Sequence, residues 1–290
     1  MNTERKTRNT LRRINVKRIT KAVKKLFIEA NTVLDEDVIE ALQQAQSREE
    51  SETGRQVLQK IIENADIARC KKMPICQDTG LAVVFVELGQ DVHITGGPLH
   101  AAIEEGVRQA YNEGYLRKSV CDPLSRKNTT DNLPAIIHVD IVSGDRLKII
   151  AMPKGGGSEN VSAAKMLTPA AGIDGIKKFV MDTMAAAGAN PCPPVIVGVG
   201  IGGSLEQSCV MAKKALLRPV GEANRIDERV EQIEKELYQS INNLGIGPAG
   251  LGGRVTALAV HVEMRPCHIA SLPVAVNIQC HVARHKETTL

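Results

Sequence analysis

The densest group of reactive side chains lies at residues 76–80, where the sequence reads Cys-Gln-Asp-Thr-Gly. An apolar run follows at residues 81–86, so this segment stands at the mouth of a predicted strand. A thiolate can bind a soft metal, and the carboxylate of Asp78 can move a proton on a molecule that the metal holds. Taken alone, the segment also fits a turn with a buried Cys76 and an Asx-type hydrogen bond.

Two more cysteines have comparable settings. Cys192 lies between Pro191 and Pro193, which fix the local backbone, and Cys280 ends the apolar run 273–279. None of the three belongs to a C-x-x-C pair, so the spacing does not by itself identify an iron–sulfur or zinc site. The remaining four cysteines lack such a setting and are predicted to be structural: Cys70, Cys121, Cys209 and Cys267. Seven cysteines without a secretory signal disfavour a disulfide framework.

Two glycine-rich segments have rival interpretations. Residues 154–158, Lys-Gly-Gly-Gly-Ser, favour a nest of backbone N–H groups for an anion over a flexible turn. Residues 198–203 match G-x-G-x-x-G, but a dinucleotide site also needs an acidic residue at the end of a second strand. Residues 219–227 are polar and predict no such strand. Close packing of a strand against a helix is therefore the better account, and a nicotinamide-dependent dehydrogenase is the rival.

Hydrophobic periodicity predicts a helical N-terminal layer followed by strands and further helices. The predicted helices lie at residues 16–30, 35–46, 52–69, 98–115, 172–187, 205–217 and 226–244. The predicted strands lie at residues 81–88, 135–142, 147–152, 195–199, 255–262 and 273–279, with a hairpin turn at 143–145. Strands and helices do not alternate regularly, which favours an α+β fold with a mixed, largely antiparallel sheet flanked by helices. We expect a basic arm at residues 1–14 and one domain over residues 15–290.

The charge distribution bears on partners. The net charge is +4, but residues 1–25 hold ten Lys and Arg against one Glu, which leaves −5 for the rest of the chain. Aromatic residues make up only 2% of the chain, so neither a broad basic surface nor a stacking platform for nucleic acid is expected. No apolar run is long enough to cross a membrane, and no apolar signal core begins the chain. We therefore expect a cytoplasmic protein that binds neither nucleic acid nor membrane.

Several motifs together resemble one family. They are residues 76–80 (CQDTG), 115–119 (YLRKS), 154–160 (KGGGSEN), 190–194 (NPCPP) and 268–285 (HIASLPVAVNIQCHVARH). Their order resembles the class I, iron–sulfur-dependent fumarate hydratases, in particular the alpha subunit of the two-subunit form. The related tartrate dehydratase alpha subunit shares part of the pattern, and the KGGGSEN and NIQCHVARH runs look closer to fumarase. The resemblance implies a lyase of the tricarboxylic acid cycle that reversibly dehydrates (S)-malate to fumarate, with tartrate as the alternative substrate.

The resemblance also implies a cofactor. By position, Cys76, Cys192 and Cys280 would bind three irons of a [4Fe–4S] cluster and leave the fourth iron open as a Lewis acid. Asp78 aligns with the family's catalytic carboxylate.

The implied substrate contacts come from four positions. Gln77 lies beside the catalytic carboxylate, and Arg117 aligns with an arginine that grips a substrate carboxylate, a task that suits a planar guanidinium. Gly157 would make a backbone contact. His268 aligns with a histidine near the substrate, although a satisfied core histidine is an equal alternative there.

Single-chain members of the family carry a further C-terminal domain, which we expect a separate chain to supply here. The resemblance therefore implies a separate beta subunit, in an alpha2–beta2 assembly that acts on a small dicarboxylate. A non-catalytic scaffold that pairs with a partner and holds no iron is the alternative from a different class.

Overall fold

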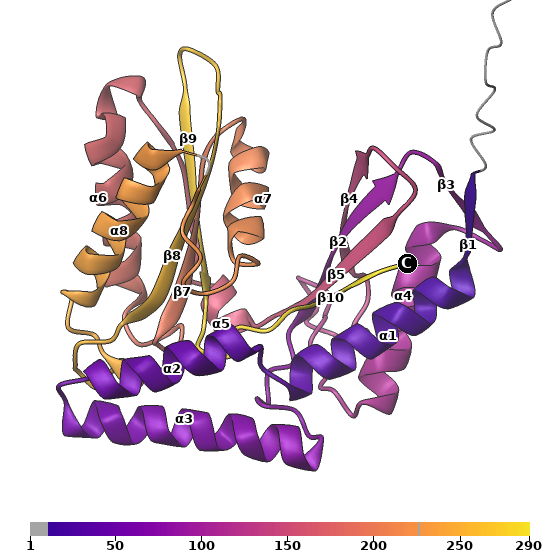
Figure 1. Ribbon diagram of the computed structural model, residues 1–290, viewed down its shortest axis with the longest axis horizontal. Coiled ribbons are helices and arrows are strands. Elements are labelled where there is room, and N and C mark those ends of the chain that lie inside the picture. Colours follow the sequence, from indigo (N-terminus) through magenta and orange to yellow (C-terminus); the bar gives the residue numbers. More distant parts are fainter. Residues whose placement is uncertain (1–10, 226) are drawn as a thin grey trace, which may run out of the picture. The chain divides into compact units, whose positions relative to one another are not determined.

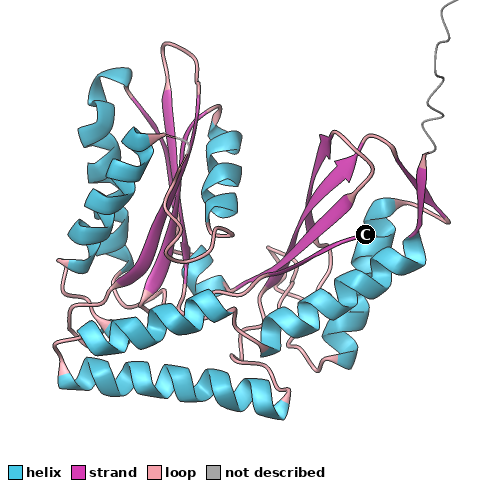
Figure 2. Ribbon diagram, viewed as in Figure 1, coloured by secondary structure: helices cyan, strands magenta, loops and turns pink. Residues whose placement is uncertain are grey.

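The computed structural model describes residues 11–225 and 227–290, and the chain divides into two compact units (Figures 1 and 2). The first unit holds the chain up to Thr32, Cys76–Lys154 and Arg284–Leu290, and the second holds Val33–Ile75 and Gly155–Ala283. The α+β prediction is confirmed, since helices flank mixed sheets in both units. That residues 15–290 fold as one domain, and that a basic arm ends at residue 14, stay predictions; residues 1–10 lie outside the described part.

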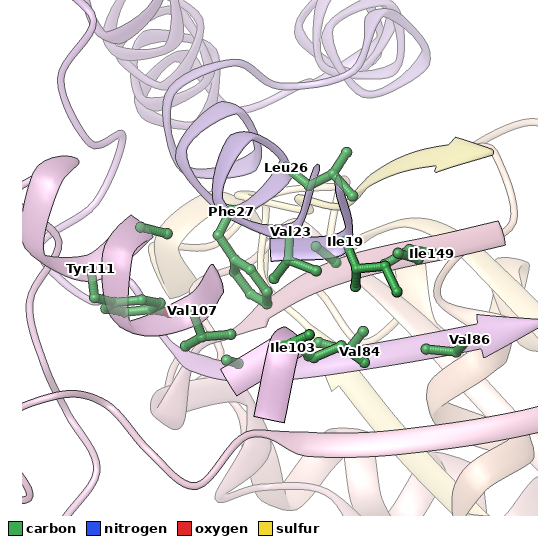
Figure 3. Close-up of a cluster of buried hydrophobic side chains, with 14 of the residues drawn as sticks. Ile19, Val23, Leu26, Phe27, Val84, Val86, Ile103, Val107, Tyr111 and Ile149 are labelled. Carbon is green, nitrogen blue, oxygen red and sulfur yellow. The ribbon is translucent and has the colours of Figure 1, made fainter. Parts of the chain in front are cut away.

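The first unit is built on a four-stranded sheet in the order β10-β5-β2-β4. Its strands are β2 (Leu81–Gly89), β4 (Ile136–Val142), β5 (Leu147–Lys154) and β10 (Lys286–Thr289). Helices α1 (Val16–Thr32) and α4 (Leu99–Glu113) pack against each other and supply apolar side chains to the core. Figure 3 shows Phe27 and Tyr111 of these helices in one cluster with Val84 and Ile149 of the sheet. A parallel pair, β1 (Arg12–Asn15) and β3 (Val92–Thr95), completes the unit.

The predicted hairpin of residues 135–152 is wrong. The two strands do not pair with each other, because β2 lies between β4 and β5, parallel to the first and antiparallel to the second. The turn at residues 143–146 instead packs against the end of β2, where a Cβ on Gly89 would lie 2.3 Å from the carbonyl oxygen of Gly144. Local turn residues predicted the reversal of the chain correctly but not the strand that enters between its arms.

The second unit has a sheet in the order β6-β9-β7-β8. Its strands are β6 (Ala163–Leu167), β7 (Val195–Gly202), β8 (Ala257–Arg265) and β9 (Leu272–Gln279). Helices α6 (Gly172–Ala187) and α8 (Glu228–Asn242) share its apolar core, and α7 (Leu205–Ala215) covers the other face. The short helices are α5 (Gly156–Glu159), η1 (Pro169–Ala171) and η2 (Pro248–Gly250). Each of the two large sheets contains two antiparallel pairs and one parallel pair.

The glycines of β7 allow α7 to approach the strand closely. A Cβ on Gly198 would lie 2.0 Å from the carbonyl oxygen of Ala212, and one on Gly200 would lie 2.0 Å from that of Ser208. Residues 217–225 form no strand. The packing interpretation of residues 198–203 is therefore confirmed, since any side chain at these two positions would push the helix off the sheet.

Helices α2 (Glu36–Arg48) and α3 (Glu52–Lys71) also belong to the second unit. The buried carboxylate of Glu49, between them, accepts hydrogen bonds from the backbone N–H groups of Arg254 and Val255, both at 2.8 Å. Ser51 caps α3 by accepting from the N–H of Gly54 at 3.1 Å. These contacts fix the turn between the two helices to the start of β8. Along the described part of the chain, no helix is long and apolar enough to cross a membrane.

Candidate active site

The 76–80 loop is a tightly hydrogen-bonded turn at the start of β2. The backbone N–H of Asp78 lies 3.4 Å from the sulfur of Cys76, and the N–H of Gly80 donates to Asp78 Oδ1 at 2.9 Å. Gly80 has a φ of +77°, and a Cβ there would lie 2.7 Å from backbone atoms of Lys154. Only glycine fits this position, because any side chain would collide with the backbone of Lys154. The two N–H contacts orient the thiol of Cys76 and the carboxylate of Asp78 in this turn.

Three side chains from elsewhere in the first unit, those of Tyr111, Arg284 and Asn132, hold the backbone of this loop. The hydroxyl of Tyr111 lies 2.8 Å from the carbonyl oxygens of both Thr79 and Gly80, which share its single proton. Thr79 in turn donates from Oγ1 to the carbonyl of Arg117 at 2.7 Å, which joins the loop to the segment that carries Arg117. Burial raises the pKa of Tyr111, the nearby Arg284 opposes this, and the Asp78 charge adds to it. The phenol therefore stays protonated and remains a donor.

Arg284 is the second of these side chains. Its guanidinium donates from Nη2 to the carbonyl of Asp78, and the residue is only 3% exposed. Within the described residues, its Nε and Nη1 have no hydrogen-bond partner. Arg284 thus holds the backbone of Asp78 and keeps two buried N–H groups for further acceptors.

Asn132 connects the long polar segment to the same loop. Its amide donates to the carbonyl of Gly80 at 3.2 Å, and its Oδ1 accepts from the N–H of Ser119 at 2.7 Å. The 119–132 segment is thus tied to the loop that carries Asp78 by an amide that is fully buried. Asp78 and Arg117, which the sequence places 39 residues apart, lie on adjoining loops.

In the second unit the structure brings Cys192 and Cys280 together. The carbonyl of Cys192 accepts from Nδ1 of His281 at 2.9 Å and from the His281 backbone N–H at 3.4 Å. Burial lowers the pKa of His281, so the ring is neutral with its proton on Nδ1, because a carbonyl can only accept. Cys192 has a φ of +55°, an unusual conformation for a residue with a side chain, held between two prolines.

Gly157 lies in the same neighbourhood. A Cβ on Gly157 would lie 3.5 Å from the carbonyl oxygen of Asn190, two residues before Cys192. The backbone N–H of Ile278, two residues before Cys280, donates to Ser162 at 3.1 Å, just beyond α5. Gly157, Cys192 and Cys280 therefore gather at one end of the second sheet.

His268 lies elsewhere in the second unit. It belongs to the turn between β8 and β9, where its Nδ1 accepts from the N–H of Ala270 at 3.1 Å. Cys280 follows the opposite end of β9, and the eight residues of that strand span about 25 Å. The second unit alone does not bring His268 to Cys192 and Cys280, and its substrate contact stays a prediction.

The donor set fits an iron–sulfur cluster in its chemistry. All seven cysteines lie within the described residues and none forms a disulfide; Cys192 is exposed, and Cys76 and Cys280 are partly exposed. Accessible thiols on rigid turns, with a backbone N–H beside the Cys76 sulfur, suit thiolate ligands. Across residues 11–225 and 227–290, no three His, Cys, Asp or Glu side chains converge on a point that one metal ion could fill. A cluster makes a different demand, since each thiolate binds its own iron.

The family follows from sequence comparison. The profile of the family described as "Fumarate hydratase (Fumerase)" matches residues 20–289, nearly the whole chain. This chain belongs to the fumarate hydratase family. It is accordingly an alpha-type subunit of the hydro-lyase class, and the resemblance inferred from the motifs is confirmed.

The relatives of this fumarate hydratase family member carry a narrower name. A protein of Methanocaldococcus jannaschii named "Putative L(+)-tartrate dehydratase subunit alpha" is 47% identical over 273 residues, covering 92% of this chain and 95% of its own length. The protein named L(+)-tartrate dehydratase subunit alpha from Escherichia coli strain K12 is 31% identical over 279 residues, covering 95% and 91%. The one from Shigella sonnei matches with the same values. The substrate in these names is L(+)-tartrate, whereas the motifs led us to expect malate.

Several residues of the site were not found from the sequence. Tyr111 lies in the predicted helix 98–115, Asn132 lies outside the predicted helices and strands, and Arg284 lies in the 268–285 motif, where the sequence gives it no role. Each acts on a backbone carbonyl of the 76–80 loop, an interaction that leaves no pattern in the sequence. The one hint was the length of the polar stretch 119–132, because long loops in compact domains are uncommon unless they have a function.

Proposed function

We propose that this chain is the alpha subunit of a dehydratase that removes water from L(+)-tartrate. The observation that carries the proposal is the 47% identity, over nearly all of both chains, to a relative that bears this name. The names of the relatives also support a separate beta subunit, and we propose an alpha2–beta2 assembly. A cytoplasmic location stays a prediction.

The reaction needs three things from the protein. Hydroxide must leave one carbon, a proton must leave the neighbouring carbon, and both carboxylates of the substrate must be held. The hydroxide and the proton form the released water, and the carbon–carbon bond becomes a double bond. Tartrate then gives an enol that rearranges to a keto acid, whereas malate gives fumarate directly.

Asp78 is the proposed acid/base. Its carboxylate is oriented by the N–H of Gly80, and its backbone carbonyl is held by Arg284. A carboxylate fixed in this way can transfer a proton at the carbon next to the leaving hydroxyl. Gln77 precedes it in the loop and is the proposed contact for a substrate hydroxyl or carboxylate.

Arg117 is the proposed anchor for a substrate carboxylate. Thr79 holds the Arg117 carbonyl, so the arginine starts from a backbone fixed to the Asp78 loop. A bidentate guanidinium–carboxylate pair would orient the substrate as well as bind it. Gly157 and His268 are the remaining proposed contacts.

We propose that Cys76, Cys192 and Cys280 hold a [4Fe–4S] cluster. When bound, the cluster supplies a Lewis-acid iron that makes the hydroxyl of the substrate a better leaving group. The chain itself contributes the placement of the three sulfurs. The N–H of Asp78 lies beside the sulfur of Cys76, and His281, next to Cys280, holds the carbonyl of Cys192.

The ligand assignment is tested by iron content. In protein purified without oxygen, Cys192→Ser should lose most of its iron. Cys209→Ser should keep it, because Cys209 is an exposed residue of α7 and not one of the three proposed ligands. Equal iron in the two variants would remove Cys192 from the ligand set, and an iron-free wild-type protein would favour the scaffold alternative.

The substrate is tested by steady-state kinetics. The chain, co-expressed with its beta subunit under anaerobic conditions, should have a higher kcat/KM for L(+)-tartrate than for (S)-malate. A site that hydrogen-bonds a hydroxyl can reject the analogue that lacks it by as much as roughly 10⁴-fold, so a ratio above about 100 is expected. Malate is the second candidate, favoured by the family description and by the KGGGSEN and NIQCHVARH motifs. A higher kcat/KM for malate would select it, and no dehydration of either acid would overturn the proposal.

A further inference from the structure

Strand β4 is an exposed apolar edge of the first sheet. It pairs with β2 on one side, and no other strand in the described residues pairs with its outer side. Its sequence is Ile-Ile-His-Val-Asp-Ile-Val, without the Lys, Pro or bulge that commonly protects an edge. Side chains along it are exposed to solvent, 36% for Val139 and 71% for Ile141. An edge of this kind is a template for another strand.

The other edges of the two four-stranded sheets, β8, β6 and β10, are protected. On β8, Glu234 accepts from the backbone N–H of Val262 at 2.7 Å, and Arg218 donates to its carbonyl at 3.1 Å. Strand β6 is five residues long and carries Lys165 at its centre, and β10 is polar throughout. Among the outer strands of these two sheets, β4 is therefore the one with an open apolar edge.

The direction of the backbone groups along β4 follows from its pairing with β2. The carbonyl of Val142 accepts from the N–H of Gln90 at 2.8 Å, so the backbone groups of Val142 face β2. In a parallel pair alternate residues face the partner, which leaves three residues with N–H and C=O directed to the outer edge. Those residues are Ile137, Val139 and Ile141.

We infer that β4 pairs antiparallel with β4 of a second copy of this chain, with the two-fold axis at Val139. This register puts Val139 opposite itself and Ile137 opposite Ile141, so the outward N–H and C=O groups of both copies meet. A two-fold interface requires such self-complementarity, with each residue contacting its symmetry-related counterpart.

The side chains of β4 are complementary in the same register. His138 of each copy lies opposite Asp140 of the other, and Ile136 lies opposite Val142. His138 and Asp140 then occupy a non-hydrogen-bonded position, where paired side chains are closest. Shifting the register by two residues would put Asp140 opposite itself and oppose like charges. The sequence of this strand thus selects a copy of itself as the partner.

Cysteine cross-linking tests the register. The two Val139 Cα atoms would lie about 5.5 Å apart, within the range that a disulfide spans. The full-length Val139→Cys protein should form a covalent dimer on mild oxidation, with a 139–139 linkage identified by mass spectrometry. The Ile141→Cys protein is the matched control, because its two cysteines would lie about 13 Å apart along the strands even though residue 141 is more exposed. Equal cross-linking of both variants, no 139–139 linkage, or linkage to a different protein would each overturn the inference.

A charged substitution gives an independent measure. Val139→Lys places two ammonium groups opposite each other at the two-fold axis and should raise the dimer dissociation constant at least about tenfold in sedimentation measurements. Leu124→Lys adds the same charge at a position of the first unit that is 92% exposed and outside β4, and it should leave the dissociation constant unchanged. An unchanged constant in the Val139→Lys protein would overturn the inference. If that variant did not fold, the cross-linking result would decide alone.

Discussion

Replacing Tyr111 by Phe removes one hydroxyl from beneath the 76–80 loop and little else. The ring is fully buried in the first core and lies 6.2 Å, between centroids, from that of Phe27. Phenylalanine keeps this packing, so the area buried by the ring does not change. The hydroxyl, however, is the donor to the carbonyls of Thr79 and Gly80.

The loss of stability in Tyr111→Phe depends on which of the two carbonyls keeps a hydrogen bond. The Gly80 carbonyl keeps its hydrogen bond from Asn132, at 3.2 Å. Thr79 is only 1% exposed, and its carbonyl loses the hydroxyl of Tyr111. A buried acceptor left unsatisfied costs about 1–3 kcal/mol, so we expect the free energy of unfolding to fall by about 2 kcal/mol. The loop that carries Asp78 should also be held less firmly, which lowers turnover.

Urea unfolding, followed with the wild-type and variant proteins in parallel, measures this change. Tyr115→Phe is the control, because its side chain lies in the same unit and is 90% exposed. It should stay within about 0.5 kcal/mol of wild type. A Tyr111→Phe protein as stable as this control would refute the role of the hydroxyl in holding the loop.

Three further predictions concern stability and catalysis. Burial, with the nearby charge of Arg218, lowers the pKa of His261 from 6.5 to about 4. As the pH falls from 7 to 5, His261 therefore gains a proton in the unfolded chain but not in the folded chain, and the free energy of unfolding should fall by about 2 kcal/mol. In urea titrations a His261→Asn protein should lack this part of the pH dependence. Glu49→Gln should lower the free energy of unfolding by about 1–3 kcal/mol. The two carboxylate oxygens accept from the N–H groups of Arg254 and Val255, whereas an amide has one oxygen that accepts and an NH2 group that cannot. An unchanged urea midpoint would contradict this. Asp78→Asn should keep the iron of the wild-type protein and lose roughly 10²- to 10⁴-fold in turnover, and near-normal turnover would reassign the acid/base role.

The sequence determined the elements of the fold with good accuracy. The periodic segment 172–187 coincides with α6, and the segment 52–69 falls within α3. The segment 35–46 begins one residue before α2 begins and ends two residues before α2 ends. Hydrophobic periodicity works here because each of these helices buries one face, and that face repeats along the chain at the helical period. The glycines at 198 and 200 were also interpreted correctly, since the missing acidic strand could be judged from the sequence.

The sequence also pointed to the residues with reactive groups, because thiols, carboxylates and guanidiniums are visible as residue types. It placed Cys76 and Asp78 on one loop, since neighbours in sequence share a turn. It also supplied the motifs that led to the family.

Only the tertiary structure decided which segments meet. Strand β2 enters between β4 and β5, so two strands joined by a convincing turn are separated by one that precedes both of them. The hydroxyl of Tyr111 and the guanidinium of Arg284 reach the same loop from positions 173 residues apart. Pairing of distant strands and bonds to backbone carbonyls depend on geometry that any residue's backbone can supply. A short stretch of sequence therefore does not show which distant strand will pair or which carbonyl will be bound. These contacts depend on how the whole chain folds.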